Sequence, residues 1–185
     1  MAEDLRKQVK RLEIKLIKIG KNEVPKAASS ALNSVAKKSR TRIASVVAKS
    51  KKIKVGLVRK KIFIRRSNPK SQRALITAYA QDIPAVSVLT SRTLLAKARR
   101  GTNRKGVRVA GKQIDGAFIN VVRRSGRFHV LKRSGKSRYP IDVVKIPIAN
   151  TVKRHSSKIV RAVHSRDFRR IYARELNFRL NKYAK

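Results

Sequence analysis

Two short runs of β-branched and aromatic residues, joined by a glycine-containing turn, constrain the fold of this chain most strongly. The runs are Ala117 to Val122 (AFINVV) and Arg127 to Leu131 (RFHVL), and Ser125-Gly126 lies between them. Because glycine takes the positive φ that a tight turn requires, the segment predicts an antiparallel hairpin. We expect Phe118 and Val130 to be buried, and truncation of Phe118 to alanine to cost roughly 3–5 kcal/mol.

The chain leaves this hairpin through a segment bracketed by two prolines, Arg138 to Pro147 (RYPIDVVKIP). Pro140 and Pro147 cannot donate a hydrogen bond to a neighbouring strand. Each therefore belongs at a strand edge, in a turn or at the start of a helix. The hairpin and its exit predict a scaffold and carry no catalytic chemistry.

The blocks GAFINVV, GRFHVLKR and RYPIDVVKIPIA, within Gly111 to Ala149, resemble the minor tail protein Z family of long-tailed bacteriophages and prophages. The likeness extends upstream to Val24–Ala28 and to Asp82–Val86. It implies a structural tail-completion protein in the virion tail, acting at its head-proximal end near the head–tail joint. Other tail and neck proteins are then the expected partners, and a homo-oligomeric ring, sixfold to match the tail, is the expected assembly. This chain departs from many relatives at Ile146-Pro147, where they carry a glycine-proline pair, and at Phe128, where an indole is common.

The charge of the chain is extreme, because 50 Lys and Arg stand against 9 Asp and Glu for a formal net charge of +41. Self-repulsion on that scale opposes compactness and calls for a polyanionic partner or an assembled context. Lysine and arginine bind phosphates with strong salt dependence and little regard for sequence. The chain shows no zinc-finger spacing, RNA-recognition motif or recognition helix, so we expect contact with the phosphates of genomic double-stranded DNA.

Basic residues concentrate in one acid-free stretch and in one loop. From Val24 to Gln81 there is no acidic residue and 16 positions are Lys or Arg. Lys97 to Lys105 (KARRGTNRK) adds a basic loop around Gly101. The residues expected to contact nucleic acid or a partner protein are Lys51, Lys52, Lys54, Arg59, Lys60, Lys61, Arg65, Arg66, Lys97, Arg99, Arg100, Arg104 and Lys105. The alternative is that these side chains meet acidic patches on neighbouring tail proteins.

Two helices are predicted in the first 49 residues. The first carries apolar residues at spacings of 4, 3, 4 and 3, and Gly20 is its expected stop. Its stripe consists of Leu5, Val9, Leu12, Leu16 and Ile19. This stripe packs either on its own domain or between subunits. Pro25 suits the first turn of a second helix that runs to about Lys49.

The remaining pattern predicts short strands and C-terminal helices. Arg73–Ala80, Ala85–Leu89 and Val107–Val109 are expected to join the hairpin in a mostly antiparallel sheet of about four or five strands. A helix after Pro147 is expected to give way to a second, terminal helix with Asp167 as its N-cap. The prediction is an α+β fold in a single domain, 1–185. It has a helical arm over 1–49, a sheet with basic loops over 50–145 and C-terminal helices over 146–185.

Several other classes are disfavoured. The chain has no cysteine, no apolar run long enough to span a membrane and no signal-peptide core, so we expect it to be made in the host cytoplasm. Gly135-Lys136-Ser137 lacks the earlier glycine of a P-loop. The three histidines and the carboxylates are too dispersed to predict a metal site, a cofactor or an enzyme. A ribosomal or nucleoid-type basic protein explains the charge equally well, but it has no need of the AFINVV and YPIDVVKIP blocks.

Overall fold

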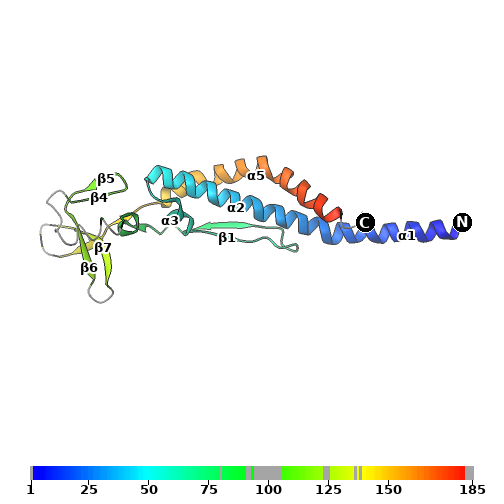
Figure 1. Cartoon of the computed structure of the whole chain (residues 1–185), viewed down its shortest axis with the longest axis horizontal. Helices are drawn as coiled ribbons and strands as arrows, with labels where there is room; N and C mark the ends of the chain where they lie inside the picture. Colours follow the sequence, from blue (N-terminus) through cyan, green and yellow to red (C-terminus); the bar gives the residue numbers. More distant parts are fainter. Residues whose placement is uncertain are drawn as a thin grey trace. The chain divides into compact units, whose positions relative to one another are not determined.

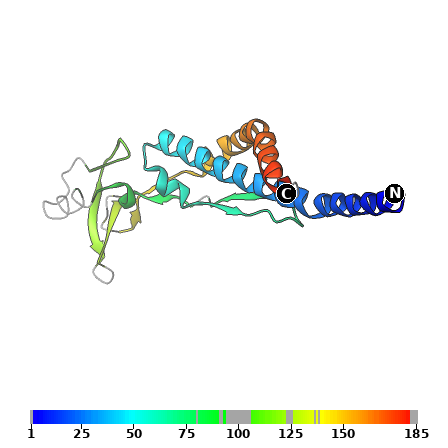
Figure 2. The same ribbon diagram turned by 45° about the vertical axis from the view of Figure 1, so that its right-hand side comes forward.

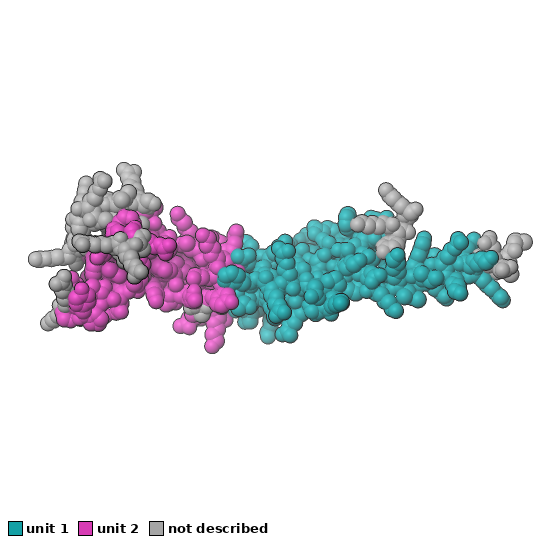
Figure 3. Space-filling view, turned by 90° about the horizontal axis from the view of Figure 1, so that it is seen from below, with its two compact units in different colours: residues 1–42, 63–77, 156–185 teal, residues 43–62, 78–155 magenta. Residues whose placement is uncertain are grey.

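The computed structural model describes residues 2–79, 81–90, 93, 106–122, 126–135, 137 and 139–181. The fold is α+β, as predicted (Figure 1). Long helices occupy the first and last parts of the sequence, and the residues between them in sequence form small antiparallel sheets. The chain divides into two compact units, each built from segments distant in sequence. Unit 1 comprises residues 1–42, 63–77 and 156–185, and unit 2 comprises 43–62 and 78–155 (Figure 3).

The N-terminal helices do not stop at Gly20, contrary to the prediction. Helix α1 (Ala2–Lys18) runs through a π-helical turn, η1 (Ile19–Glu23), into α2 (Val24–Lys51). Pro25 has no N–H to donate to the preceding turn, which accounts for a change of hydrogen-bond register here: Val24 donates to the carbonyl of Ile19. The predicted second helix is confirmed, with bounds within two residues of those expected.

The side chains of α1 lie in solvent. Every residue from 6 to 18 is exposed, and the apolar Val9, Leu12 and Leu16 are each more than half exposed. The sequence predicts that the apolar stripe of α1 packs either on its own domain or between subunits. The first of these two predictions is wrong for the described residues.

One continuous helix, α5 (Ala149–Leu180), replaces the two predicted C-terminal helices. Asp167 lies in its interior and caps no helix, because no glycine or proline interrupts the segment. In unit 1, α5 lies beside α2 in both ribbon views (Figure 1 and Figure 2). Ala31 and Val35 of α2 form a buried cluster with Val163 and Ile171 of α5.

A two-stranded sheet joins β1 (Ile62–Arg65) to β2 (Leu75–Ala78). The connection between them is fastened to α2 by Asn33. Its Nδ2 donates to the carbonyl oxygen of Ser67 at 3.0 Å, and its Oδ1 accepts from the Ser67 amide at 2.8 Å. Strand β2 confirms the strand expected within Arg73–Ala80.

The predicted hairpin is the centre of unit 2. Strands β6 (Ala117–Val122) and β7 (Arg127–Arg133) pair antiparallel, and β8 (Ile141–Val143) joins β7 directly after Pro140. Val130 is fully buried, as expected, in a core with Ala85, Val107, Val109, Ala117 and Ile119. Phe118 is not: the register pairs Ile119 with Val130, so Phe118 lies on the opposite face, half-buried. The Arg133 guanidinium lies 5.8 Å from the centre of its ring.

In place of the single sheet expected from the sequence, the described residues form four small sheets. Strands β4 (Val107–Val109) and β5 (Lys112–Ile114) form a hairpin, and β3 (Ile83–Pro84) pairs with β9 (Lys145–Ile146). The expected strand over Ala85–Leu89 is a short 3-10 helix, η2 (Ala85–Val88), that follows Pro84. The ladder with β9 ends at Pro84, which has no N–H to donate, although the Ala85 amide still donates to the carbonyl of Val144 at 2.9 Å.

Candidate nucleic-acid interface

The basic segment consists of residues 51–66. It begins at Lys51, the last residue of α2, and contains the short helix α3 (Val55–Arg59) and strand β1. Of the eight candidate residues in this segment, Lys51 and Lys61 are half-buried. The six exposed ones are Lys52, Lys54, Arg59, Lys60, Arg65 and Arg66.

These candidates divide between the two units. Residues 51–61 belong to unit 2, whereas Arg65 and Arg66 belong to unit 1. The five candidates of the predicted loop lie outside the described residues: Lys97, Arg99, Arg100, Arg104 and Lys105.

Most of the candidate charges that the structure describes have no described carboxylate as a counter-charge. Lys61 Nζ donates to Gln81 Oε1 at 3.2 Å, which is a neutral partner. Among the described side chains, no carboxylate lies within ion-pairing distance of six others, namely Lys51, Lys52, Lys54, Lys60, Arg65 and Arg66. Their charge is therefore available to an external anion.

Two carboxylates of unit 1, Asp167 and Glu23, are engaged in ion pairs with described side chains. Asp167, only 4% exposed, accepts from Lys38 Nζ at 3.2 Å and from Arg166 Nε at 3.1 Å. The hydrogen bond from Arg166 is the largest influence on this carboxyl group and, with Lys38, lowers its pKa to about 2. Glu23 accepts from Lys26 and Arg179, and both contacts lower its pKa. These pairs fasten α2 and η1 to α5 within unit 1.

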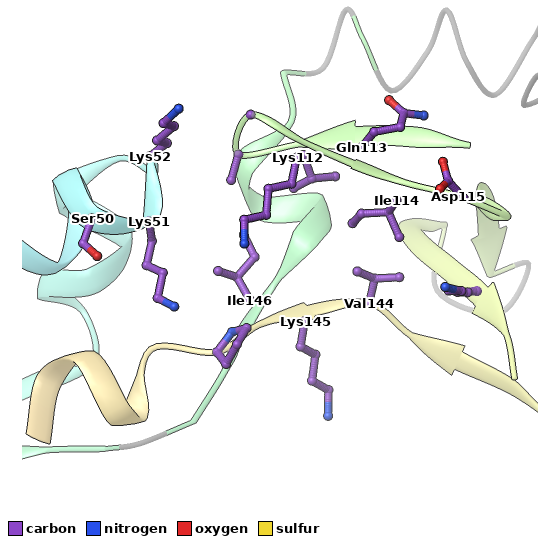
Figure 4. Close-up of a pocket in the computed structure, with 15 residues that line it drawn as sticks. Ser50, Lys51, Lys52, Lys112, Gln113, Ile114, Asp115, Val144, Lys145 and Ile146 are labelled. Carbon is purple, nitrogen blue, oxygen red and sulfur yellow. The ribbon is translucent and has the colours of Figure 1, made fainter. Parts of the chain in front are cut away.

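A pocket of about 480 Å³ lies in unit 2, between the end of α2, the β4–β5 hairpin and the chain around β9 (Figure 4). Lys51 and Lys112 point into the space between the helix end and the hairpin in Figure 4. Five lysines line the pocket, against one carboxylate, that of Asp115: Lys51, Lys52, Lys112, Lys132 and Lys145. Sequence reasoning found only the first two, because the other three are scattered over strands whose proximity depends on the tertiary fold.

The described residues contain no group of three His, Asp or Glu side chains placed to hold a metal ion. His155 and His164 lie on α5, whereas His129 lies on β7. None of the helices in the described part is both long and apolar enough to span a membrane.

Comparison with known proteins settles the family. Residues 7–185 match the family model described as prophage minor tail protein Z (GPZ). The chain belongs to this family. The resemblance seen in the sequence is thereby confirmed, and this minor tail protein Z relative is a structural protein of the phage tail whose partners are other tail proteins.

Two relatives of this minor tail protein show how far the similarity extends. The chain is 38% identical over 144 residues to tail completion protein Z of Escherichia phage lambda. This alignment covers 72% of the present chain and 74% of the lambda protein. The chain is 34% identical over 135 residues to the tail completion protein of Escherichia phage N15, covering 71% and 72%. No solved structure matches the chain. The family match gives no support to the ribosomal or nucleoid alternative.

Proposed function

We propose that this protein completes the head-proximal end of a phage tail, near the head–tail joint, and holds genomic double-stranded DNA there through its phosphates. It acts as a structural protein and not as an enzyme. The two relatives named above are tail completion proteins, and each aligns over more than two thirds of its length. The observation that carries the DNA contact is a set of exposed basic residues with no described carboxylate within ion-pairing distance: Lys52, Lys54, Lys60, Arg65 and Arg66.

The chemistry of this contact suits a conduit for DNA. Each ammonium or guanidinium that neutralises a phosphate releases condensed counterions, so affinity depends on salt and hardly on base sequence. A sequence-blind contact retains the genome in the particle and still allows its release. The basic loop with Lys97, Arg99, Arg100, Arg104 and Lys105 is included in the proposed contact on its sequence alone.

The proposed assembly is a homo-oligomeric ring, sixfold to match the tail, that forms in the host cytoplasm. Copies with a formal charge of +41 repel one another, so a ring requires DNA or acidic tail and neck proteins to offset that repulsion. In addition, the exposed stripe of Val9, Leu12 and Leu16 on α1 offers a surface for a neighbouring subunit, which is the second of its two expected packing modes.

The DNA contact is tested by measuring duplex binding over a range of salt concentrations. A glutamine variant removes four charges from the basic segment: Lys54, Lys60, Arg65 and Arg66. A control variant removes four equally exposed charges from α5: Lys153, Arg154, Lys158 and Arg161. Each phosphate contact contributes about −0.9 to the slope of log affinity against log salt. We expect the first variant to flatten the slope by roughly 2–4 and the control to leave it nearly unchanged.

Replacing Arg99, Arg100, Arg104 and Lys105 by serine tests the loop in the same assay. If the basic-segment variant and its α5 control give equal slopes of log affinity against log salt, DNA affinity depends only on the total charge of the chain. If the protein does not bind duplex DNA near physiological salt, the basic segment contacts acidic protein partners instead.

A further inference from the structure

The pocket of unit 2 combines a cationic rim with an apolar floor. The floor is formed by aliphatic side chains from three strands and the segment that follows them: Val109, Ile114, Val144, Ile146 and Pro147. None of the five rim lysines pairs with a described carboxylate, and Asp115 is the pocket's one acid. The site therefore suits a ligand that is both anionic and apolar.

Lys52 occupies a backbone position that normally belongs to glycine. Its amide donates to the carbonyl of Lys49 and that of Ile53 to Ala48, which is the hydrogen-bond pattern of a Schellman motif ending α2. The central residue of this motif takes a left-handed conformation, and Lys52 has φ 52°. A lysine is strained there, whereas a glycine is not.

The strained position sets Lys52 against the turn of the β4–β5 hairpin. A Cβ atom added to Gly111, which has φ +78°, would lie only 3.1 Å from Cδ of Lys52. The two residues are thus in close contact along one wall of the pocket. Ala110, beside Gly111, also has a left-handed φ of 52°. The wall is built from a lysine and a turn that both depart from the ordinary backbone conformations of their residue types.

We propose that this pocket binds an acidic, aliphatic peptide segment of another tail protein. Carboxylates of the segment meet the rim lysines, and its aliphatic side chains cover the floor. All three residues of β5 line the pocket, and β5 lies at the edge of a two-stranded sheet, so an extended segment can lie along it. The volume of about 480 Å³ is that of an ordinary small-ligand site.

The apolar floor favours a peptide over duplex DNA. A duplex presents phosphates and sugars on its outer surface, which satisfy exposed lysines but leave an aliphatic floor uncovered in water. A peptide with alternating acidic and aliphatic residues satisfies both parts of the pocket. This inference goes beyond the proposed function, because the pocket can hold a protein segment whether or not the basic segment holds DNA.

The test uses a fluorescein-labelled peptide of alternating leucine and glutamate, titrated with the full chain at physiological salt and followed by fluorescence anisotropy. A second peptide of alternating serine and glutamate has the same charge and no aliphatic side chains. We expect the leucine peptide to bind about tenfold more tightly, since only it covers the floor. Lys51 and Lys52 belong both to this pocket and to the basic segment proposed to hold DNA, so unlabelled duplex DNA should compete to some extent, but less effectively than the unlabelled leucine peptide at equal charge concentration.

Three variants locate the binding. Lys51→Gln with Lys112→Gln removes the two rim lysine charges that point into the pocket in Figure 4 and should weaken binding of the leucine peptide about tenfold. The control, Lys153→Gln with Lys158→Gln, removes two exposed charges of α5 that do not line the pocket and should leave peptide affinity unchanged. Lys52→Gly should raise the melting temperature, because glycine relieves the backbone strain, and should lower the affinity for the peptide. A residue with a purely structural role does not give this combination.

Three results would overturn the proposal. Equal affinity of the leucine and serine peptides, or an unchanged affinity in the rim variant, would show that the chain attracts any polyanion. Displacement of the peptide by duplex DNA as effective as that by the unlabelled leucine peptide, with the rim variant losing affinity for both ligands, would make the pocket a phosphate site.

Discussion

Truncation of Val130 to alanine should destabilise the hairpin of unit 2 more than truncation of Phe118. Val130 is fully buried opposite Ile119, in the cluster with Ala85 and Val107. The valine change removes two methyl groups, whose transfer from water stabilises the fold by about 1.6 kcal/mol. The empty volume of roughly 50 Å³ adds up to about 1.2 kcal/mol if the site does not collapse. The expected loss is therefore about 2–3 kcal/mol.

Phe118 is larger, yet its change should cost less. Its ring is half-buried on the opposite face of β6, so its burial contributes about 1 kcal/mol. The Arg133 guanidinium, 5.8 Å from the ring centre, adds about 0.5 kcal/mol as an exposed cation–π contact. The sum of about 1.5 kcal/mol is well below the 3–5 kcal/mol that the sequence predicts for a core phenylalanine.

Hydrogen exchange followed by mass spectrometry is the appropriate assay, because it reads the opening free energy of β6 and β7 separately from the helices of unit 1. Amides of these strands should lose more protection in Val130→Ala than in Phe118→Ala. A matched variant, Leu131→Ala, changes the residue that faces Phe118 across the strands and should resemble Phe118→Ala. A larger loss for Phe118→Ala than for Val130→Ala would refute the assignment of the two faces.

Three further perturbations follow from the contacts of unit 1. The folded-state pKa of Asp167, about 2, lies below its ordinary value of 3.8, so the stability it contributes is present above pH 3.8 and is lost as pH falls toward 2. The melting temperature of Asp167→Asn should therefore lie below that of the parent at neutral pH and approach it near pH 2. A difference in melting temperature that stays constant with pH would contradict this. Asn33→Ala removes both hydrogen bonds to the buried Ser67 backbone and should cost about 1–3 kcal/mol in urea denaturation, whereas no measurable loss would show that the connection after β1 is held otherwise. Deleting residues 1–18 should leave the melting temperature of the monomer unchanged, because no described side chain from 6 to 18 is buried; a marked fall would mean that α1 packs on the chain.

Local signals predicted the elements whose boundaries are chemically marked. The hairpin follows from two β-branched runs around a glycine, and Gly126 takes the expected positive φ of 62°. The start of α2 follows from Pro25. In both cases a residue with a restricted or special backbone conformation sits where the element changes.

The errors arose where a local signal competes with tertiary contacts. Asp167 is a good N-cap in isolation, but inside α5 its carboxylate is held by Lys38 from another helix, 129 residues away in sequence. Gly20 lacks a helix-ending conformation because the π-helical turn carries the chain onward. Alternation along β6 fixed which residues share a face, but only the register with β7 shows which face is buried.

The candidate site was predictable to the same extent. The basic segment is contiguous, so its charge is visible in the sequence, and the structure adds that most of it is exposed. The pocket is not contiguous, because β5, β7 and β9 each bring one lysine to the end of α2. No spacing rule links Lys112, Lys132 and Lys145, since their proximity depends on how the small sheets pack.

The measurement that tests the central claim most directly is a crosslink formed inside assembled particles. A photoreactive p-benzoylphenylalanine placed at exposed Lys60 would be irradiated in complete virions and in tails assembled without heads. The proposed role predicts an adduct with genomic DNA in the virions, from DNA at the head–tail joint, and none in the headless tails. Adducts only with tail or neck proteins in both samples would contradict the proposal that the basic segment holds the genome.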